Sequence, residues 1–211
     1  MNEHMRTLDM KNQLDHHTPR HRLSGMTLIE LMIAIAILVV LMVMAIPSFQ
    51  SLIASSRLRT ASSDFSITLA QARSNAIRRG ARVTVCKSSN GTQCATTGDW
   101  SQGWIMFEDD THSGTNPNVD TVASVTETIT RVAPATTSGI VIKSNNQDYV
   151  SFAADGQPKN MDGGGYYGTI RICSTSTALS NDARASNLVL SRTGRIVIEK
   201  QTGIAATCPA P

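Results

Sequence analysis

Apolar residues dominate one stretch near the N-terminus of the chain. Residues 26–46 read MTLIELMIAIAILVVLMVMAI, and only Thr27 and Glu30 interrupt the run. At 1.5 Å per residue an α-helix of this length is roughly 31 Å long, about the thickness of the hydrocarbon core of a bilayer. The pattern therefore predicts a helix that can span a membrane.

Beyond Pro47 the pattern stays helical but becomes amphipathic. Apolar residues recur three and four positions apart, which places them on one helical face, and Gly80 is a suitable stop after a basic last turn. We predict one long helix over residues 26–79, bent or locally unwound at Pro47, because proline removes a backbone donor and clashes with the preceding turn. The apolar face comprises Leu58, Ala61, Phe65, Leu69, Ala72 and Ala76.

The rest of the chain has the pattern of short strands separated by turn signals such as Asn90-Gly91 and Thr193-Gly194. Strands that follow a single packed helix predict an α+β fold, with the long helix packed on an antiparallel β-sheet. Residues 109–121 have the composition of a polar surface loop. The predicted strands are residues 81–87, 104–107, 139–143, 149–153, 169–173, 187–191 and 195–200.

Composition narrows the possible classes only a little. The chain has 211 residues, of which 41% are hydrophobic and 4% aromatic, and a net charge of +3. This length suits one globular domain plus an additional element, and the charge is too small to indicate nucleic-acid or membrane-surface binding by itself. The even number of cysteines fits an oxidising compartment if the domain is exported, and a metal site or chance if it is not.

Three interpretations compete for the apolar segment. It can be a plain anchor, a secretory signal cleaved after Ala45, or the start of a processed subunit. The polar, basic segment before it should stay cytoplasmic, so the bulk of the chain should face outward. Glu30 favours processing, because a carboxylate in a membrane helix costs about 2.5–3.5 kcal/mol at mid-bilayer and needs a partner. Cleavage between Gly25 and Met26 would supply a free amine as that partner.

Residues 24–31, SGMTLIEL, resemble the prepilin signature of type IV pilins and type II secretion pseudopilins. In those families a prepilin peptidase cuts after the glycine and methylates the new N-terminus. The resemblance implies that Gly25 ends a leader, that Met26 becomes the methylated N-terminus, and that Glu30 pairs with the amine of a neighbouring subunit during assembly. Pro47 matches a proline that pilin-like helices commonly carry near this depth.

Residues 69–107 narrow the family further. The stretch LAQARSNAIRRG, then VTVC, NGT and WSQGW, is similar to the GspH/FimT family, and more to its FimT- and FimU-type minor pilins. The resemblance implies a long N-terminal helix and a β-rich head. The expected organisation is a leader at 1–25, a transmembrane and assembly helix at 26–46, an amphipathic helix at 47–80 and a β-rich periplasmic head at 81–211.

The four cysteines are candidates for two disulfides. Cys86 and Cys94 lie eight positions apart across a turn-rich loop, so a local bridge is easy, and Cys173 would then pair with Cys208. This sequential pairing is favoured, although four cysteines allow three connectivities and the sequence does not choose among them. A zinc site is not expected, because there is no C-x-x-C and only His112 lies outside the leader.

Enzymatic chemistry finds little support. A catalytic arrangement would have to use His112, which lies in a polar loop with no nucleophile motif nearby. No phosphate-binding glycine motif occurs, and the acidic loop at 108–110 lacks the spacing of a calcium-binding loop. We therefore expect no catalytic residues, no cofactor and no metal.

The basic C-terminal stretch raises a different hypothesis. Residues 192–200, RTGRIVIEK, resemble the Gly-Arg stretch by which some FimT-type minor pilins bind DNA during natural transformation. Arg192, Arg195 and Lys200 would then contact phosphates without sequence preference. Glu199 opposes this charge, and the alternating isoleucines also suit an ordinary exposed strand. The ordinary strand is the favoured interpretation, and DNA binding stays open.

The sequence as a whole predicts a minor type IV pilin that helps to initiate or cap a pilus. The expected partners are other minor pilins, the major pilin, the prepilin peptidase and the assembly platform. The subunit should cross the inner membrane once, with a periplasmic head, and should later lie in or at the tip of the fibre. The alternatives are a type II secretion pseudopilin and a DNA-binding minor pilin.

Overall fold

The computed structural model of the chain describes residues 25–111, 116–122, 125–145 and 147–211. The predicted leader, apart from Gly25, and His112 lie outside the described residues. Residues 43–211 form one compact unit, and the residues up to 42 belong to another.

One long helix opens the described chain, as the sequence predicts. Helix α1 runs from Leu28 to Arg79, and Gly80, with φ +66°, ends it by donating its N–H to the Ala76 carbonyl at 3.0 Å. The helical backbone continues through Pro47, so the unwinding predicted there does not occur. Proline costs a helix one backbone hydrogen bond but keeps helical dihedral angles. The bend predicted as the alternative stays a prediction.

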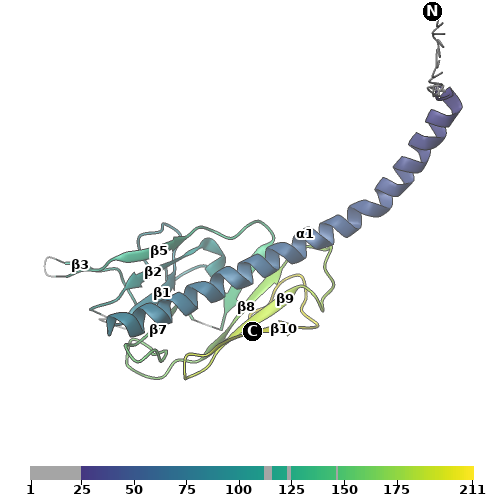
Figure 1. Cartoon of the computed structure of the whole chain (residues 1–211). Helices are drawn as coiled ribbons and strands as arrows, with labels where there is room; N and C mark the ends of the chain where they lie inside the picture. The colour runs from purple at the N-terminus through teal and green to yellow at the C-terminus, as the bar shows by residue number, and fades with distance from the viewer. Residues whose placement is uncertain (1–24, 112–115, 123–124, 146) are drawn as a thin grey trace, which may run out of the picture. The chain divides into compact units, whose positions relative to one another are not determined.

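Two four-stranded antiparallel sheets form most of the described head, whereas the sequence predicts a single sheet (Figure 1). The first sheet has the order β5-β2-β1-β7 and the second has the order β10-β9-β8-β6. Periodicity locates strands but does not say which strands pair, so the division was not predictable from it. The first sheet comprises β1 (Val83–Lys87), β2 (Trp104–Glu108), β5 (Ile129–Ala133) and β7 (Tyr149–Phe152); the second comprises β6 (Ile140–Ser144), β8 (Gly168–Ser174), β9 (Ala185–Leu190) and β10 (Ile196–Gln201).

Three of the described strands were not predicted. Strands β3 (Thr121–Val122) and β4 (Val125–Thr126) pair with each other in a small separate sheet, and β5 follows them. Strands of two residues are too short to produce an alternating pattern. The 3-10 helix η1 (Trp100–Gln102) leads into β2, where the sequence gives no periodic signal.

The second half of α1 packs one face onto both sheets (Figure 1). The predicted apolar face is the buried one, with Ala61 only partly buried. Phe65 is fully buried, and its ring meets the rings of Trp100 and Trp104 edge-on at centroid distances of 5.1 and 5.0 Å. Each such aromatic pair stabilises the fold by about 0.5–1.5 kcal/mol beyond the area it buries.

Both disulfides lie outside this shared core. Cys86 is bonded to Cys94 within a smaller apolar cluster of the first sheet, and Cys173 is bonded to Cys208 within a cluster of the second. Strand alternation explains the separation, because Val85 belongs to the shared core and its neighbour Cys86 therefore points to the opposite face. The bonds follow the sequential pairing that the sequence favoured.

Candidate functional site

The expected cleavage point is open to approach. No described atom lies within 4 Å of the position that a Cβ on Gly25 would take, and Met26 is exposed. Both residues precede the first turn of α1. The peptide bond between them therefore lies outside the described helix.

Glu30 occupies the first turn of α1. Thr27 is the N-cap residue, and its Oγ1 accepts the backbone N–H of Glu30 at 3.3 Å. A carboxylate three residues after a threonine cap is the arrangement of a capping box, and the positive end of the helix dipole favours it. No described residue donates a hydrogen bond or an ion pair to the Glu30 side chain.

The apolar side chains around Glu30 are uncovered. An 18-residue window of α1 has a mean hydropathy of 3.0 and none of it is buried, so by length and composition the helix can cross a membrane. Leu38, for example, is 49% exposed. A surface this apolar is stable only against lipid or against other apolar helices.

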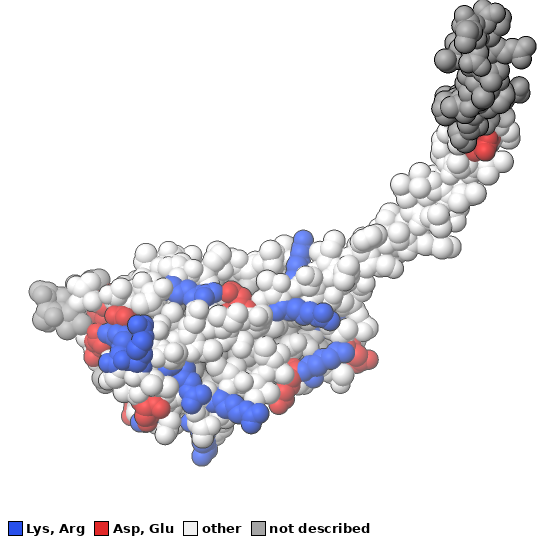
Figure 2. All heavy atoms as spheres, viewed as in Figure 1, with Lys and Arg blue, Asp and Glu red and all other residues white. Residues whose placement is uncertain are grey.

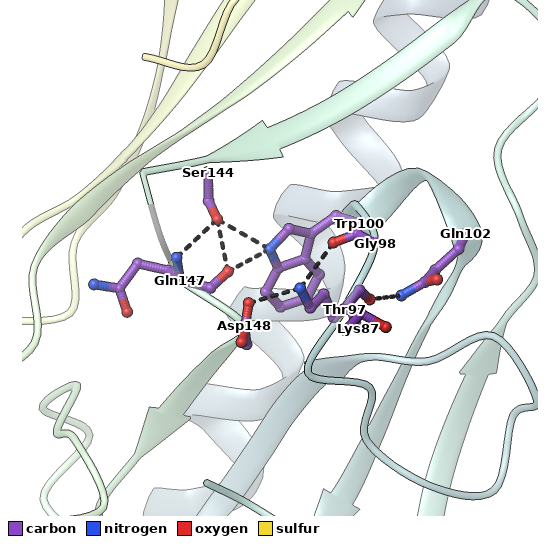
Figure 3. Close-up of polar contacts among 8 residues, drawn as sticks. All are labelled: Lys87, Thr97, Gly98, Trp100, Gln102, Ser144, Gln147 and Asp148. Carbon is purple, nitrogen blue, oxygen red and sulfur yellow. Dashed lines mark hydrogen bonds and ion pairs between the residues drawn. The ribbon is translucent and has the colours of Figure 1, made fainter. Parts of the chain in front are cut away.

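A buried polar cluster in the head was not predicted from the sequence (Figure 3). Lys87 is almost fully buried, and its Nζ lies 2.6 Å from Asp148 Oδ1 and donates to the Gly98 carbonyl at 2.8 Å. Trp100 Nε1 donates to the Gln147 carbonyl at 2.8 Å. These contacts tie the segment before β2 to the connection between β6 and β7.

The Lys87 cluster has the properties of a structural element. It surrounds a small cavity of about 140 Å³, and each of its buried polar groups has a partner inside the fold. Asp148 is partly exposed, so its loss would leave the buried Lys87 charge with the Gly98 carbonyl and without its carboxylate partner. Within the described ranges no group of three His, Cys, Asp or Glu residues could hold a metal ion.

The carboxylates of the acidic loop at residues 108–110 have partners within the head. Arg79 pairs with Glu108 at 3.1 Å and with Asp110 at 3.3 Å, and Thr84 donates to the buried Asp109 at 2.5 Å. Glu108 and Asp110 hold Arg79, at the end of α1, and Asp109 is bonded to β1 through Thr84.

The three basic residues proposed to bind DNA do not form one cluster. Arg192 lies over the ring of the exposed Tyr167, 4.5 Å from its centroid, and Arg195 lines a groove beside α1. Lys200 is five residues further along β10, roughly 16 Å from Arg195 at the rise of a strand. A nucleic acid would have to follow the whole strand to contact all three.

Arg73 is a second residue that the sequence did not single out. Its guanidinium donates to the carbonyls of Gly156 at 3.0 Å, Gly194 at 2.9 Å and Thr193 at 2.9 Å. Gly194 has φ +76°, which favours glycine, and a Cβ there would lie 2.5 Å from the Gly156 oxygen. Arg73 thus ties the helix to two turns that are far away in the sequence. A contact between such distant residues cannot be predicted from a local sequence pattern.

Two family models match the chain. A prokaryotic N-terminal methylation motif matches residues 20–46, and the model described as type II transport protein GspH matches residues 61–194. Together with the uncovered helix and the β-rich head, these matches define a pilin-like subunit that an apolar helix anchors in a membrane. The second match spans more than half of the chain, so the protein belongs to the GspH family, whose members are structural subunits.

Solved structures give a weaker likeness. The type IV minor pilin FimU of Pseudomonas aeruginosa is 17% identical in one crystal form, with a TM-score of 0.48 over 68% of this chain and 89% of that one. A second crystal form of FimU is 16% identical, with a TM-score of 0.45 over 67% and 91%. No curated protein matches the chain.

Proposed function

We propose that this chain is a minor type IV pilin that is processed after Gly25. The first half of α1 then holds it in the inner membrane, with the head in the periplasm. Other minor pilins, the major pilin and the assembly platform build it into the fibre or its tip. The observation that carries the proposal is an apolar helix that no other described segment covers, with one carboxylate, Glu30, in its first turn that has no partner among the described residues.

The physical argument concerns the partner of that carboxylate. An unpaired charge beside lipid is costly, and the energy is recovered when an ammonium group lies next to it. Cleavage before Met26 creates such a group on each mature subunit. Glu30 of one subunit can then pair with the N-terminus of its neighbour, while the apolar flanks pack together.

Mass spectrometry of the subunit from its native membrane tests the processing step. The mature chain should begin at Met26 and carry one additional methyl group on its amine. A chain that keeps its first 25 residues in assembled fibres would contradict the proposal.

Replacing the carboxylate tests the assembly step. Glu30→Ala should lower the amount of subunit in purified fibres at least about tenfold, because a buried amine left unpaired costs several kcal/mol. Asp99→Ala removes a carboxylate of the same charge from an exposed position of the head and should leave incorporation unchanged. Equal incorporation of both variants would remove Glu30 from the assembly mechanism.

A second candidate is a type II secretion pseudopilin, which the description of the matching family model favours. The same helix and carboxylate would then serve a different machine. Co-purification separates the two: enrichment with pilins supports the minor pilin, and enrichment with secretion-system components supports the pseudopilin.

The third candidate is a DNA-binding minor pilin, favoured by Arg192 stacked on the exposed Tyr167. Exposed arginines beside aromatic rings bind single strands by charge and stacking. Replacing Arg192, Arg195 and Lys200 by Ala should abolish a gel shift by the head, and Arg59→Ala should not. If the unmodified head does not shift DNA either, this candidate fails.

A further inference from the structure

Strand β10 is the open edge of the head. On the far side of the second sheet, η1 covers β6, and Ser101 Oγ accepts the N–H of Ile142 at 2.8 Å. In the first sheet, residues 157–159 cover β7, with the Lys159 N–H bonded to the Ser151 carbonyl at 2.9 Å. At the other edge of the first sheet, the pairing of β5 with β2 is interrupted by a register shift between Met106 and Phe107. Among the edge strands of the two four-stranded sheets that the structure describes, β10 is the long, regular one that no other segment covers, and it has no proline, glycine or bulge.

The unused groups of this edge can be assigned from the register. The Ser191 N–H donates to the Arg195 carbonyl at 2.9 Å, and antiparallel bonding alternates from that pair onward. The backbone N–H and C=O groups of Ile196, Ile198 and Lys200 therefore point away from β9. Within the described ranges none of them has a backbone partner. They form a row of donors and acceptors at the spacing of a strand.

A groove lies beside the start of this edge, between β10 and the second half of α1. It measures about 650 Å³, and its floor is apolar, with Ala70 and Ile77 from the helix and Ile196 from the strand. The side chain of Ile198, further along the same face of β10, is 47% exposed. An extended chain lying along β10 would cover these side chains.

The charge around the groove has one sign. Arg73, Arg78 and Arg195 line it, and no acidic residue does. Arg73 bonds three carbonyl oxygens, which uses three of its five N–H donors and does not neutralise its charge. None of the three arginines lies in an ion pair with any carboxylate that the structure describes. Figure 2 shows basic side chains over the α1 side of the head, with acidic side chains among them outside the groove.

We infer that β10 accepts an extended, acidic segment of a neighbouring pilin subunit as an additional strand. The inference rests on the proposed function and names the contact by which the head would meet its neighbour. Main-chain hydrogen bonds give such a complex its affinity, and alternate side chains give it specificity. The phosphates of a nucleic acid could pair with the arginines, but a nucleic acid has no repeating backbone N–H and C=O groups that would bond to the edge of β10.

Photo-crosslinking in the native host membrane tests the contact. A photoreactive phenylalanine analogue at position 200, on the full chain, should crosslink to one segment of a pilin subunit, and mass spectrometry of the joined peptides should show that segment to be acidic. The same analogue at the exposed position 182 is the control. A yield no higher than at position 182, or joining to a basic segment or to nucleic acid, overturns the inference.

A pair of variants at Ile198 separates strand addition from side-chain packing. Ile198→Pro removes an outward N–H that β9 does not use, whereas Ile198→Ala removes the side chain and keeps that N–H. The crosslink from position 200 should fall about tenfold or more in the proline variant and at most about threefold in the alanine variant. Equal crosslinking in Ile198→Pro and the unmodified chain overturns the inference, and so does equal loss in both variants.

Charge reversal provides an independent measurement if the proline variant proves unstable. Arg78→Glu combined with Arg195→Glu should reduce the same crosslink about tenfold, and Arg59→Glu, on the same helix outside the groove, should not. Retained crosslinking in the double variant overturns the acidic partner. N-terminal processing at Met26 is measured on the same samples, so a failed strand contact is distinguishable from a failed pilin assignment.

Discussion

The two halves of α1 carry similar apolar side chains and meet opposite surroundings. Leu38 in the first half is 49% exposed, whereas Leu69 in the second half is fully buried. Both lie in one uninterrupted helix. The difference lies in what packs against them, since the second half has two sheets and the first half has no cover from the described chain.

This comparison shows where each half obtains its stability. Burying a leucine side chain stabilises a structure by about 1.5–3 kcal/mol, whatever provides the apolar cover. For Leu69 that cover is part of the same chain, so its contribution belongs to folding. For Leu38 the cover has to be lipid or another subunit, so its contribution belongs to insertion and assembly.

The sharpest test of the comparison is the same substitution in both halves. Leu69→Ala should destabilise the head by about 2–5 kcal/mol, since it leaves a cavity in a closed core. Leu38→Ala should change the unfolding of the head by less than about 0.5 kcal/mol. Urea unfolding of the head, followed by tryptophan fluorescence, measures both. A similar loss of unfolding free energy in the two variants would contradict the comparison, because Leu38 would then also contribute to the stability of the head.

The disulfides sharpen the comparison within the head. Replacing Cys173 and Cys208 by Ser opens a loop of 35 residues and should cost about 4 kcal/mol, and replacing Cys86 and Cys94 opens a loop of eight and should cost about 2.5 kcal/mol. Membrane insertion of α1 should be unchanged in both. Urea midpoints in the reverse order would contradict the loop-length argument.

Arg73 is predicted to matter less than the disulfides and more than other surface arginines. Arg73→Lys keeps the charge but loses the fork that reaches three carbonyls, and should cost about 1–3 kcal/mol. Arg59→Lys, an exposed position on the same helix, is the matched control. Thermal unfolding of both variants decides whether the guanidinium geometry matters.

The smallest expected effect is at Tyr166, whose buried hydroxyl has no partner within the described ranges. Tyr166→Phe should be neutral or stabilise the head by about 1 kcal/mol, because an unsatisfied buried group is removed. Tyr167→Phe changes an exposed ring and serves as the control. A clear loss of stability in Tyr166→Phe would reveal a bonded hydroxyl.

The same residue predicts a dependence on pH. Burial, and secondarily Tyr149, raises the pKa of Tyr166 above its ordinary value of 10.0. The folded head then holds the phenolic proton more tightly than the unfolded chain does. The stability linked to Tyr166 is therefore complete below about pH 10 and is lost as the pH rises further. Between pH 9 and 11 the free energy of unfolding should therefore decline less in the Tyr166→Phe variant than in the unmodified head.

Much of the fold was predictable because its helix and strands produce periodic patterns of apolar residues in the sequence. The apolar face from Leu58 to Ala76 is the buried face of α1, and the family of the chain follows from motifs at residues 24–31 and 69–107. All seven predicted strands are present. These features repeat at 3.6 or 2 residues or match known signatures, so a single sequence reveals them.

The remainder depends on contacts between distant residues. Lys87 looks like the polar end of a strand until Asp148 and Gly98 are placed beside it, and Arg73 looks like one of several helix arginines. The division into two sheets is likewise a matter of pairing. Glu30 stands out in the sequence because one charge interrupts an apolar run, whereas the open edge at β10 follows only from the sheet order.

The attachment of Arg73 has a mechanical consequence. A subunit held by its N-terminal helix feels any tension along α1, and the second sheet receives part of that load through one side chain bonded at Gly156, Thr193 and Gly194. All three bonds come from one guanidinium group, so a displacement of the helix strains them together. The turn that begins β10 should therefore move with the helix when the chain is pulled.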